Sequence, residues 1–307
     1  MRKSGGIITG MAAVAVVLGL VSFTGLSPSP GIGTGSLVGI ANRPAADSQP
    51  NQPGAGVHDS TPSVGIGGNL QTAIDRVISD NAGYRIGVAL VDTTDNAVHE
   101  YGSAEPFVAA STAKVLAAIA YLHKVESGQA SLADPMDDYN SGYELQEMIQ
   151  DSDNNAWASV LDAIGPEELQ AYSAQTLGID YSMDENVLTA ADMARTLAGL
   201  FEGRLVDAEN TSLLLSYMRD TNFESLIPAA VPAGIQVFHK YGMLGGELHD
   251  AAILNKDGKS FVLVLYTELK DPGSSSGDVE LPDLTYDAQT AIIHQLTQAV
   301  TGAVYGV

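Results

Sequence analysis

The chain has 307 residues, with 37 acidic side chains against 14 basic ones, and it contains no Cys. The absence of Cys excludes disulfides, thiol nucleophiles and Cys-ligated metals. The net charge of −23 argues against nucleic-acid binding, because a strongly acidic surface repels phosphate groups. Six scattered His residues without Cys give no metal-binding pattern, so we expect neither a metal nor another cofactor.

The N-terminus has the pattern of an export segment. Arg2 and Lys3 precede an uncharged, apolar stretch over residues 7–26. This pattern indicates a secretory signal peptide or an uncleaved membrane anchor over residues 1–26, with its basic end left in the cytoplasm. We therefore expect an extracytoplasmic protein, secreted or anchored by residues 7–26, that touches the membrane only through this segment.

A linker and a single large domain follow. Residues 27–65 are rich in Pro and Gly, and their only charged residues are Arg43, Asp47 and Asp59, a composition typical of a flexible tether. Residues 66–307 are long enough for one domain with a sizeable core. We expect this domain to be monomeric.

The hydrophobic periodicity of the domain changes from strands to helices and back to strands. Two strands from the start of the domain and three from its end predict one antiparallel sheet, while the helices between them predict an inserted helical lobe. The fold class is therefore α+β, with a site expected at the seam between sheet and lobe. The predicted elements are a helix at 69–80; strands at 84–92 and 98–101; helices at 111–126, 143–150, 154–164, 166–177, 190–202 and 207–219; strands at 235–242, 249–255 and 260–268; and a helix at 286–300.

The first chemical motif is Ser111-Thr112-Ala113-Lys114, at the start of an apolar helix. Residues three apart lie on one helix face, so the Ser111 hydroxyl and the Lys114 amine can approach each other. Burial lowers the pKa of a lysine, which can then accept the proton of a serine nucleophile. The alternative interpretation is that Ser111 only flanks the helix and has no catalytic role.

Two further motifs follow in order, Ser152-Asp153-Asn154 and Lys240-Tyr241-Gly242. This succession resembles the penicillin-recognising serine hydrolases, namely class A β-lactamases and D-alanyl-D-alanine peptidases. The resemblance covers residues 68–304 and is nearest to the β-lactamase branch. It implies an α/β/α sandwich of the β-lactamase and transpeptidase type.

The resemblance also implies roles for the catalytic candidates. Ser111 would be the nucleophile, and Lys114 would act as its base or as an electrostatic aid. Ser152 would pass a proton to the leaving nitrogen, and Lys240 would lower the pKa of Ser152 and attract a substrate carboxylate. Ser152 or Asp153 could instead be an ordinary cap of the helix at 154–164.

The remaining candidates would bind the substrate. Asn154 would hydrogen-bond the substrate amide, and Gly242 would let the substrate backbone approach closely. The N–H groups of Ser111 and Met243 would form the oxyanion hole. Tyr241 stands where the family has Thr or Ser, so a small hydroxyl is replaced by a bulky ring that narrows the cleft.

The chain departs from the family in three other respects. No glutamate appears in a Glu-x-x-Leu-Asn pattern between the second and third motifs, where the family holds the base for deacylation; in the stretch at 171–186 the only carboxylates are those of Asp180, Asp184 and Glu185. No Arg occurs from residue 220 onward. The interval between Ser111 and Ser152 is shorter than in typical β-lactamases.

These features predict an exported serine hydrolase that forms an acyl-enzyme with a β-lactam or another small amide or ester, with weak β-lactam turnover. A D-Ala-D-Ala peptidase or esterase acting on a cell-wall peptide is an alternative. A non-catalytic domain that binds a cell-envelope ligand or protein on the same fold is another.

Overall fold

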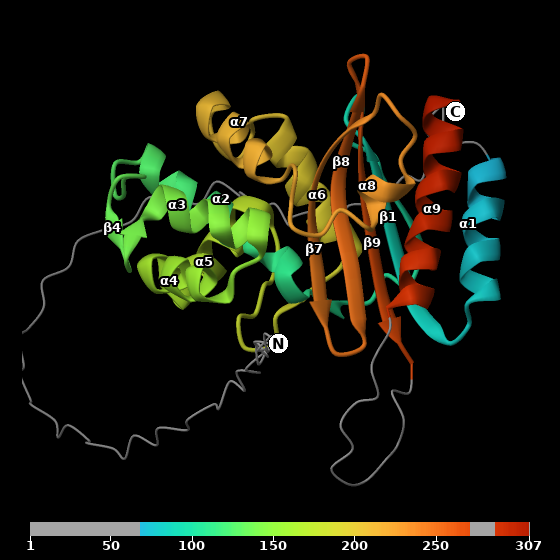
Figure 1. The fold of residues 1–307 in the computed structure, drawn as a ribbon, viewed down its shortest axis with the longest axis horizontal. Coiled ribbons are helices and arrows are strands. Elements are labelled where there is room, and N and C mark those ends of the chain that lie inside the picture. The colour runs from blue at the N-terminus through green and yellow to red at the C-terminus, as the bar shows by residue number, and fades with distance from the viewer. Residues whose placement is uncertain (1–67, 271–285, 307) are drawn as a thin grey trace, which may run out of the picture. The chain divides into compact units, whose positions relative to one another are not determined.

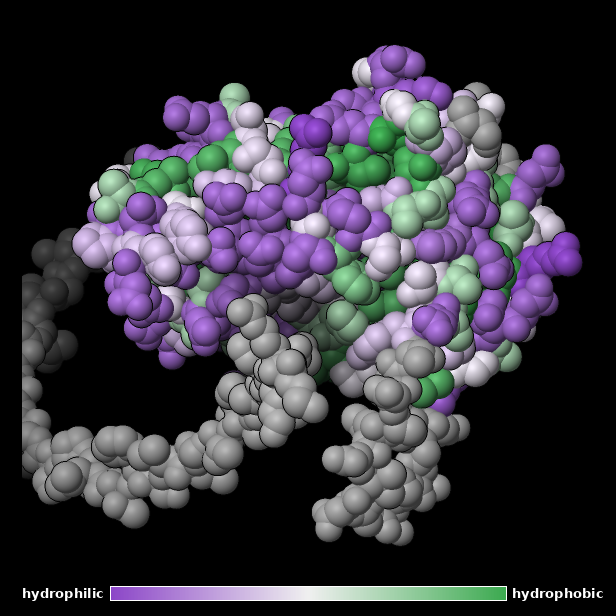
Figure 2. Space-filling view, in the orientation of Figure 1, coloured by the Kyte–Doolittle hydropathy of each residue, from purple (hydrophilic) through white to green (hydrophobic). Residues whose placement is uncertain are grey.

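The computed structural model describes residues 68–270 and 286–306. The predicted signal or anchor at 7–26 and the linker at 27–65 lie outside the described residues and stay predictions. Within the described ranges, no helix combines the length and the apolar character needed to cross a membrane. The visible surface is largely hydrophilic, with hydrophobic residues in smaller separate areas (Figure 2).

A five-stranded antiparallel sheet forms the centre of the domain, in the order β2-β1-β9-β8-β7. The two ends of the domain meet where β1 pairs with β9, from Tyr84 opposite Leu269 to Asp92 opposite Phe261. The sheet is therefore built from both ends of the domain, as the sequence predicts. Its strands are β1 (Tyr84–Asp92), β2 (Val98–Gly102), β7 (Gln236–Leu244), β8 (Glu247–Lys256) and β9 (Lys259–Leu269).

Helices cover both faces of this sheet (Figure 1). One face packs against α1, α8 and α9 through one hydrophobic core, and the other packs against α6 and the helical lobe through a second core. The predicted α/β/α architecture is confirmed. The helices are α1 (Gly68–Asp80), α2 (Lys114–Glu126), α3 (Ser141–Gln146), α4 (Asn154–Ile164), α5 (Pro166–Tyr172), α6 (Ala190–Phe201), α7 (Ala208–Tyr217), α8 (Ile227–Ala230) and α9 (Asp287–Tyr305).

Two expected helices change type before they end. The helix predicted at 143–150 is α3 followed by a π-helical turn, η2 (Glu147–Asp151), and the helix predicted at 166–177 is α5 followed by a second π turn, η3 (Ser173–Leu177). Wider π turns leave the hydrophobic spacing nearly helical, so periodicity does not reveal them.

The sequence prediction misses short strands and one short helix. Two-residue strands have too few side chains to show an alternation. They are β3 (Phe107–Val108) with β6 (Val187–Leu188), and β4 (Pro135–Met136) with β5 (Tyr139–Asn140). The helix α8 has only four residues, which are too few to show a helical periodicity.

A charged cluster, buried except for Glu224, connects the edge strand β7 to the segment that precedes it. His239 lies between two carboxylates, with Nδ1 2.8 Å from Asp250 Oδ1 and Nε2 3.1 Å from Glu224 Oε1. Asp250 is fully buried and also accepts the N–H of Ile227 at 3.0 Å. Burial alone would lower the pKa of His239, but Asp250 and then Glu224 raise it to about 9. His239 is therefore protonated at neutral pH.

The substitution Asp250→Asn tests this cluster. Because the pKa of His239 rises on folding from 6.5 to about 9, its stabilising contribution is complete below pH 6.5 and lost as the pH rises through 9. This shift in pKa corresponds to a pH-dependent contribution to the free energy of unfolding on the order of 3 kcal/mol in the wild type. We expect urea unfolding to show a large loss of stability between pH 6 and pH 10 in the wild type and a smaller loss in Asp250→Asn.

At pH 6 the Asp250→Asn variant should itself be less stable by about 3–5 kcal/mol, since one partner of a buried pair is removed. Asp257→Asn is the matched control, because Asp257 is exposed in the β8–β9 turn and Asn tolerates its positive φ of 53°. An equal pH effect in the wild type and in Asp250→Asn would contradict the assignment to His239.

Candidate active site

Ser111 lies in a single 3-10 turn, η1 (Ala110–Ala113), that leads directly into α2. The turn packs against the edge strand β7. Ala110 has a φ of +48°, a left-handed conformation that costs a non-glycine residue about 1–2 kcal/mol. Strain of this kind persists only where the surroundings hold it, and it occurs often at functional sites. The half-buried Ser111 follows immediately after this strained residue.

Lys114 begins α2 and reaches across to the second motif. Its Nζ donates to the backbone oxygen of Ser152 at 2.7 Å and to Oδ1 of Asn154 at 2.8 Å. The oxygens Asp153 O at 3.2 Å and Ser152 Oγ at 3.4 Å complete its surroundings. Burial lowers the pKa of Lys114 to about 8, and the charge of Asp153 opposes this effect. The amine thus connects the first two motifs, and within the described residues Ser111 Oγ makes no hydrogen bond.

The second motif sits on a strained turn between η2 and α4. Ser152 has a φ of 57°, which turns its carbonyl group toward Lys114. Asp153 caps α4, because its Oδ1 accepts the N–H groups of Asn155 and Ala156, both at 2.8 Å. The capping alternative therefore holds for Asp153, whereas Ser152 and Asn154 face the amine of Lys114.

The third motif lies on β7, whose outer edge faces η1. His239 donates its N–H to Met218 O at 2.8 Å, away from β8. Alternate residues of an antiparallel strand direct their N–H groups to the same side, so the N–H of Met243 points to this outer edge as well. A Cβ on Gly242 would lie 3.1 Å from Ser111 N and 3.0 Å from Ala109 O. The N–H groups of Ser111 and Met243 therefore lie in one region of the edge, as an oxyanion hole requires.

Lys240 and Tyr241 are both buried at this edge. Nζ of Lys240 donates to Tyr241 O at 3.0 Å and lies 4.1 Å from the centre of the Tyr241 ring. Burial holds the pKa of Lys240 well below its usual value; the charge of Lys114 adds to this effect and that of Asp250 opposes it. The hydroxyl of Tyr241 donates to Asn222 Oδ1 at 2.8 Å.

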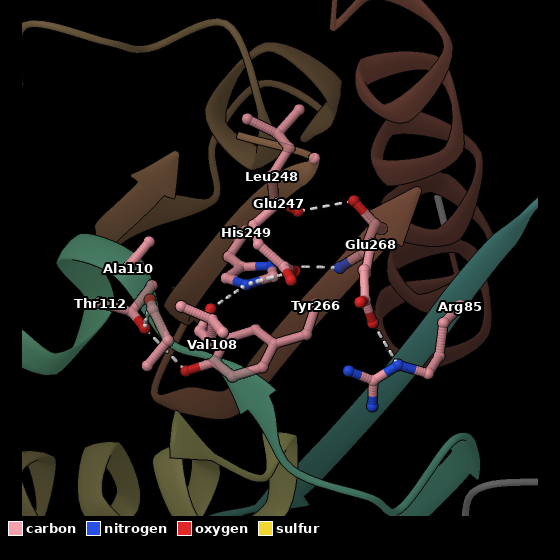
Figure 3. A network of polar contacts seen from close by, with 12 residues as sticks. Arg85, Val108, Ala110, Thr112, Glu247, Leu248, His249, Tyr266 and Glu268 are labelled. Carbon is pink, nitrogen blue, oxygen red and sulfur yellow. Dashed lines mark hydrogen bonds and ion pairs between the residues drawn. The ribbon is translucent and has the colours of Figure 1, made fainter. Parts of the chain in front are cut away.

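Buried side chains of β8 and β9 hydrogen-bond to the nucleophile turn η1 and to the strand that precedes it (Figure 3). His249 receives the N–H of Thr267 at Nδ1, so its Nε2 carries the proton and donates to Val108 O at 2.8 Å. Complete burial lowers the pKa of His249 to about 4, so it stays neutral. Tyr266 stacks on this imidazole and bonds through its hydroxyl to Thr112 Oγ1 at 2.8 Å.

The segment between the second and third motifs also contacts the nucleophile turn. Asn186 accepts the N–H of Ala109 at its backbone oxygen, at 2.7 Å, and donates from Nδ2 to Ala110 O at 3.3 Å. Its Oδ1 accepts the hydroxyl of Tyr181 at 2.9 Å. An amide, and not a carboxylate, therefore supports the strained Ala110.

The structure gathers residues of all three predicted motifs around one seam between sheet and lobe. Lys114, Ser152 and Asn154 are in direct contact, and Gly242 adjoins Ser111. Sequence reasoning does not identify the supporting residues, since they lie outside the motifs and resemble ordinary core or loop residues. These are Asn186, Asn222, His239, His249 and Tyr266. Among the described residues, no group of three or more His, Asp or Glu side chains could hold a metal ion.

The sequence profile of the β-lactamase enzyme family matches residues 69–304. The chain belongs to this family. Its similarity to individual β-lactamases is low. The chain is 28% identical over 237 residues to β-lactamase CTX-M-25 of Escherichia coli, which covers 65% of this chain and 81% of that protein. It is 27% identical over 240 residues to β-lactamase CTX-M-8 of Citrobacter amalonaticus, covering 66% and 82%.

Solved structures share the fold of this β-lactamase-family chain. PBP-A superimposes with a TM-score of 0.66 at 22% sequence identity, over 78% of this chain and 97% of that one. A mutant of PBP-A, solved as an acyl-enzyme complex with penicillin G, gives a TM-score of 0.67 at the same identity and coverage. A β-lactamase of Sphaerobacter thermophilus gives 0.64 at 22% identity, covering 78% and 98%. The family and the fold expected from the motifs are confirmed.

The contact between Gly242 and η1 yields a test of this geometry. Gly242→Ala places a methyl group about 3 Å from backbone atoms of Ala109 and Ser111, which cannot yield as a flexible side chain would. Displacement of a reacting group by about 1 Å can cost 10²-fold in rate. We expect labelling of Ser111 by a fluorophosphonate, followed by mass spectrometry, to slow by about 10- to 100-fold.

Gly83→Ala is the matched control for this substitution, because a Cβ at Gly83 meets no atom within 4 Å. It should label at the wild-type rate. Equal labelling of Gly242→Ala and the wild type would show that the close approach of β7 to Ser111 does not matter.

Proposed function

We propose that this protein is an extracytoplasmic serine hydrolase that forms an acyl-enzyme at Ser111 with a small amide or ester, and that it releases the acyl group slowly when the substrate is a β-lactam. The observation that carries this proposal is the buried Lys114, which contacts Ser152 and Asn154 one helical turn from Ser111. A purely binding domain has no need to bury a lysine beside a serine at the cost of its hydration.

Acylation forms an ester bond at Ser111 and breaks the C–N or C–O bond of the substrate. The neutral amine of Lys114 takes the proton of Ser111 Oγ as this oxygen attacks the carbonyl carbon. The N–H groups of Ser111 and Met243 stabilise the negative charge on the carbonyl oxygen. When the C–N or C–O bond breaks, Ser152 passes a proton to the leaving atom and recovers one from the Lys114 ammonium, which its Oγ contacts.

Slow deacylation is supported by the segment that contacts η1. Asn186 makes its contact with Ala110 and is held by the hydroxyl of Tyr181, and an amide cannot act as a general base for water. A missing general base typically costs about 10²–10⁴-fold in rate. The acyl-enzyme formed with a β-lactam should therefore accumulate.

The buried ring of Tyr241 favours a second candidate, a domain that only binds a cell-envelope ligand. In that case the cleft would be too narrow for a reacting substrate, and Ser111 would not acylate. A D-Ala-D-Ala peptidase or an esterase is a variant of the first proposal, because it uses the same acyl-enzyme on a different substrate.

Intact-mass spectrometry of the full chain tests the proposal. Incubation with penicillin G or with p-nitrophenyl acetate should add one acyl group to the wild type and none to Ser111→Ala. The penicilloyl adduct should persist for hours. If neither compound gives an adduct or a product that depends on Ser111, acyl transfer fails and the binding function takes its place.

The pH dependence of acylation tests Lys114 as the base. Because burial lowers the pKa of Lys114 from 10.5 to about 8, the neutral amine becomes the main form only above that pH. We expect the acylation rate with p-nitrophenyl acetate to rise tenfold per pH unit below 8 and to level off above it. A flat profile between pH 6 and pH 9 would exclude the neutral amine and leave Lys114 an electrostatic role.

A further inference from the structure

The cation at the sheet edge is not available to an anionic ligand. Lys240 is fully buried, with its Nζ bonded to the backbone oxygen of Tyr241 and positioned over the Tyr241 ring. It forms no ion pair with any carboxylate of the described residues. An ammonium held in this way is already covered on the side that the ring occupies, and its burial favours the neutral amine.

The hydroxyl of Tyr241 is also unavailable to a ligand, because it already donates a hydrogen bond within the protein. The side chain is only 8% exposed, its ring lies 4.9 Å from the ring of Phe223, and its hydroxyl donates to Asn222 Oδ1. Asn222 is itself fixed, because its Nδ2 donates to Asp151 O at 2.7 Å and its N–H to Gln150 O at 3.1 Å. The phenol therefore fills the edge without offering a free donor to a substrate.

Most of the described arginines are already occupied by carboxylates of the protein. Four of the five form ion pairs with acidic side chains, and the exposed Arg219 lies near the Phe238 ring, at 6.0 Å from its centre. The paired ones are Arg76 with Asp80, Arg85 with Glu268, Arg195 with Asp192, and Arg204 with Glu202.

The second motif adds negative charge to the same region. Asp151 and Asp153 flank Ser152, and their charges act on Tyr241 and Lys114 respectively. The ammonium form of Lys114 already has four oxygen atoms around it. A carboxylate entering this cleft would lose its hydration without gaining charge-assisted hydrogen bonds, which is strongly unfavourable.

We propose that the cleft selects acyl donors that carry no carboxylate beside the scissile bond, namely uncharged esters or amides, and that Tyr241 is the residue that sets this preference. The inference rests on the proposed acyl-enzyme at Ser111 and leaves its chemistry unchanged. Removing the ring would uncover Lys240 and open a place for a carboxylate, so the preference should depend on the size of the side chain at this position.

A matched pair of substrates tests the inference on the full chain. Penicillin G and its methyl ester differ at one carboxyl group, whose negative charge is removed by the addition of a methyl group. We expect time-resolved intact mass to show that the methyl ester acylates Ser111 at least about tenfold faster than penicillin G, a difference equivalent to 1.4 kcal/mol.

Two variants separate the ring of Tyr241 from its hydroxyl. Tyr241→Thr should raise acylation by penicillin G and remove the preference for the ester. Tyr241→Phe keeps the ring, so the preference should remain although the bond to Asn222 is lost. Equal or faster acylation of the wild type by penicillin G, or an unchanged preference in Tyr241→Thr, would overturn the inference.

The fluorophosphonate separates this failure from failure of the proposed function. If the probe labels Ser111 but the methyl ester does not react, the preference for uncharged donors is wrong while Ser111 remains a reactive nucleophile. If neither the probe nor p-nitrophenyl acetate modifies Ser111, the proposed acyl transfer is itself refuted, and the substrate preference with it.

Discussion

The structure depends on one buried amine. The side chain of Lys114 extends from the first residue of α2 and donates hydrogen bonds to backbone and side-chain oxygens of the second motif. A single cation therefore joins η1, α2 and the turn before α4. Its hydration is replaced by fixed oxygen atoms, which keeps the charged form accessible, while burial keeps the neutral form within reach at mildly basic pH. The same group therefore holds the lobe together and remains able to exchange a proton.

Two buried histidines near β7 and β8 serve different purposes because their neighbours differ. His239 has a carboxylate on each ring nitrogen and carries a charge, which locks the segment before β7 onto the sheet. His249 has a backbone N–H on one nitrogen and a carbonyl on the other, so it stays neutral and positions the chain before Ser111. Burial is nearly complete for both residues, and the chemistry of the partners decides their protonation.

The sequence predicts the elements of the sheet and of the lobe well because each depends on local signals. The continuous apolar run of β1, which is buried on both faces, and the Asp257-Gly258 turn between β8 and β9 are examples. Both turn residues have the positive φ that this hairpin requires. The capping role of Asp153 is also a local signal. In contrast, the partners of Tyr241 and Ala110 are brought to them by folding alone. Asn222 and Asn186 are ordinary loop residues by sequence, and only their positions in space give them a role.

The pairing of β1 with β9 has a consequence for how the chain reaches this structure. Val91 lies opposite Val262, and the entire helical lobe is formed by the chain between them. Bringing such distant segments together costs loop-closure entropy before any strand contact compensates for it, so the sheet forms slowly. A growing chain that has emerged only as far as the lobe holds β1 and β2 without their central neighbour. The first two strands therefore stay exposed as a two-stranded ribbon until the last part of the domain is made, and unpaired strand edges of this kind favour aggregation during that interval.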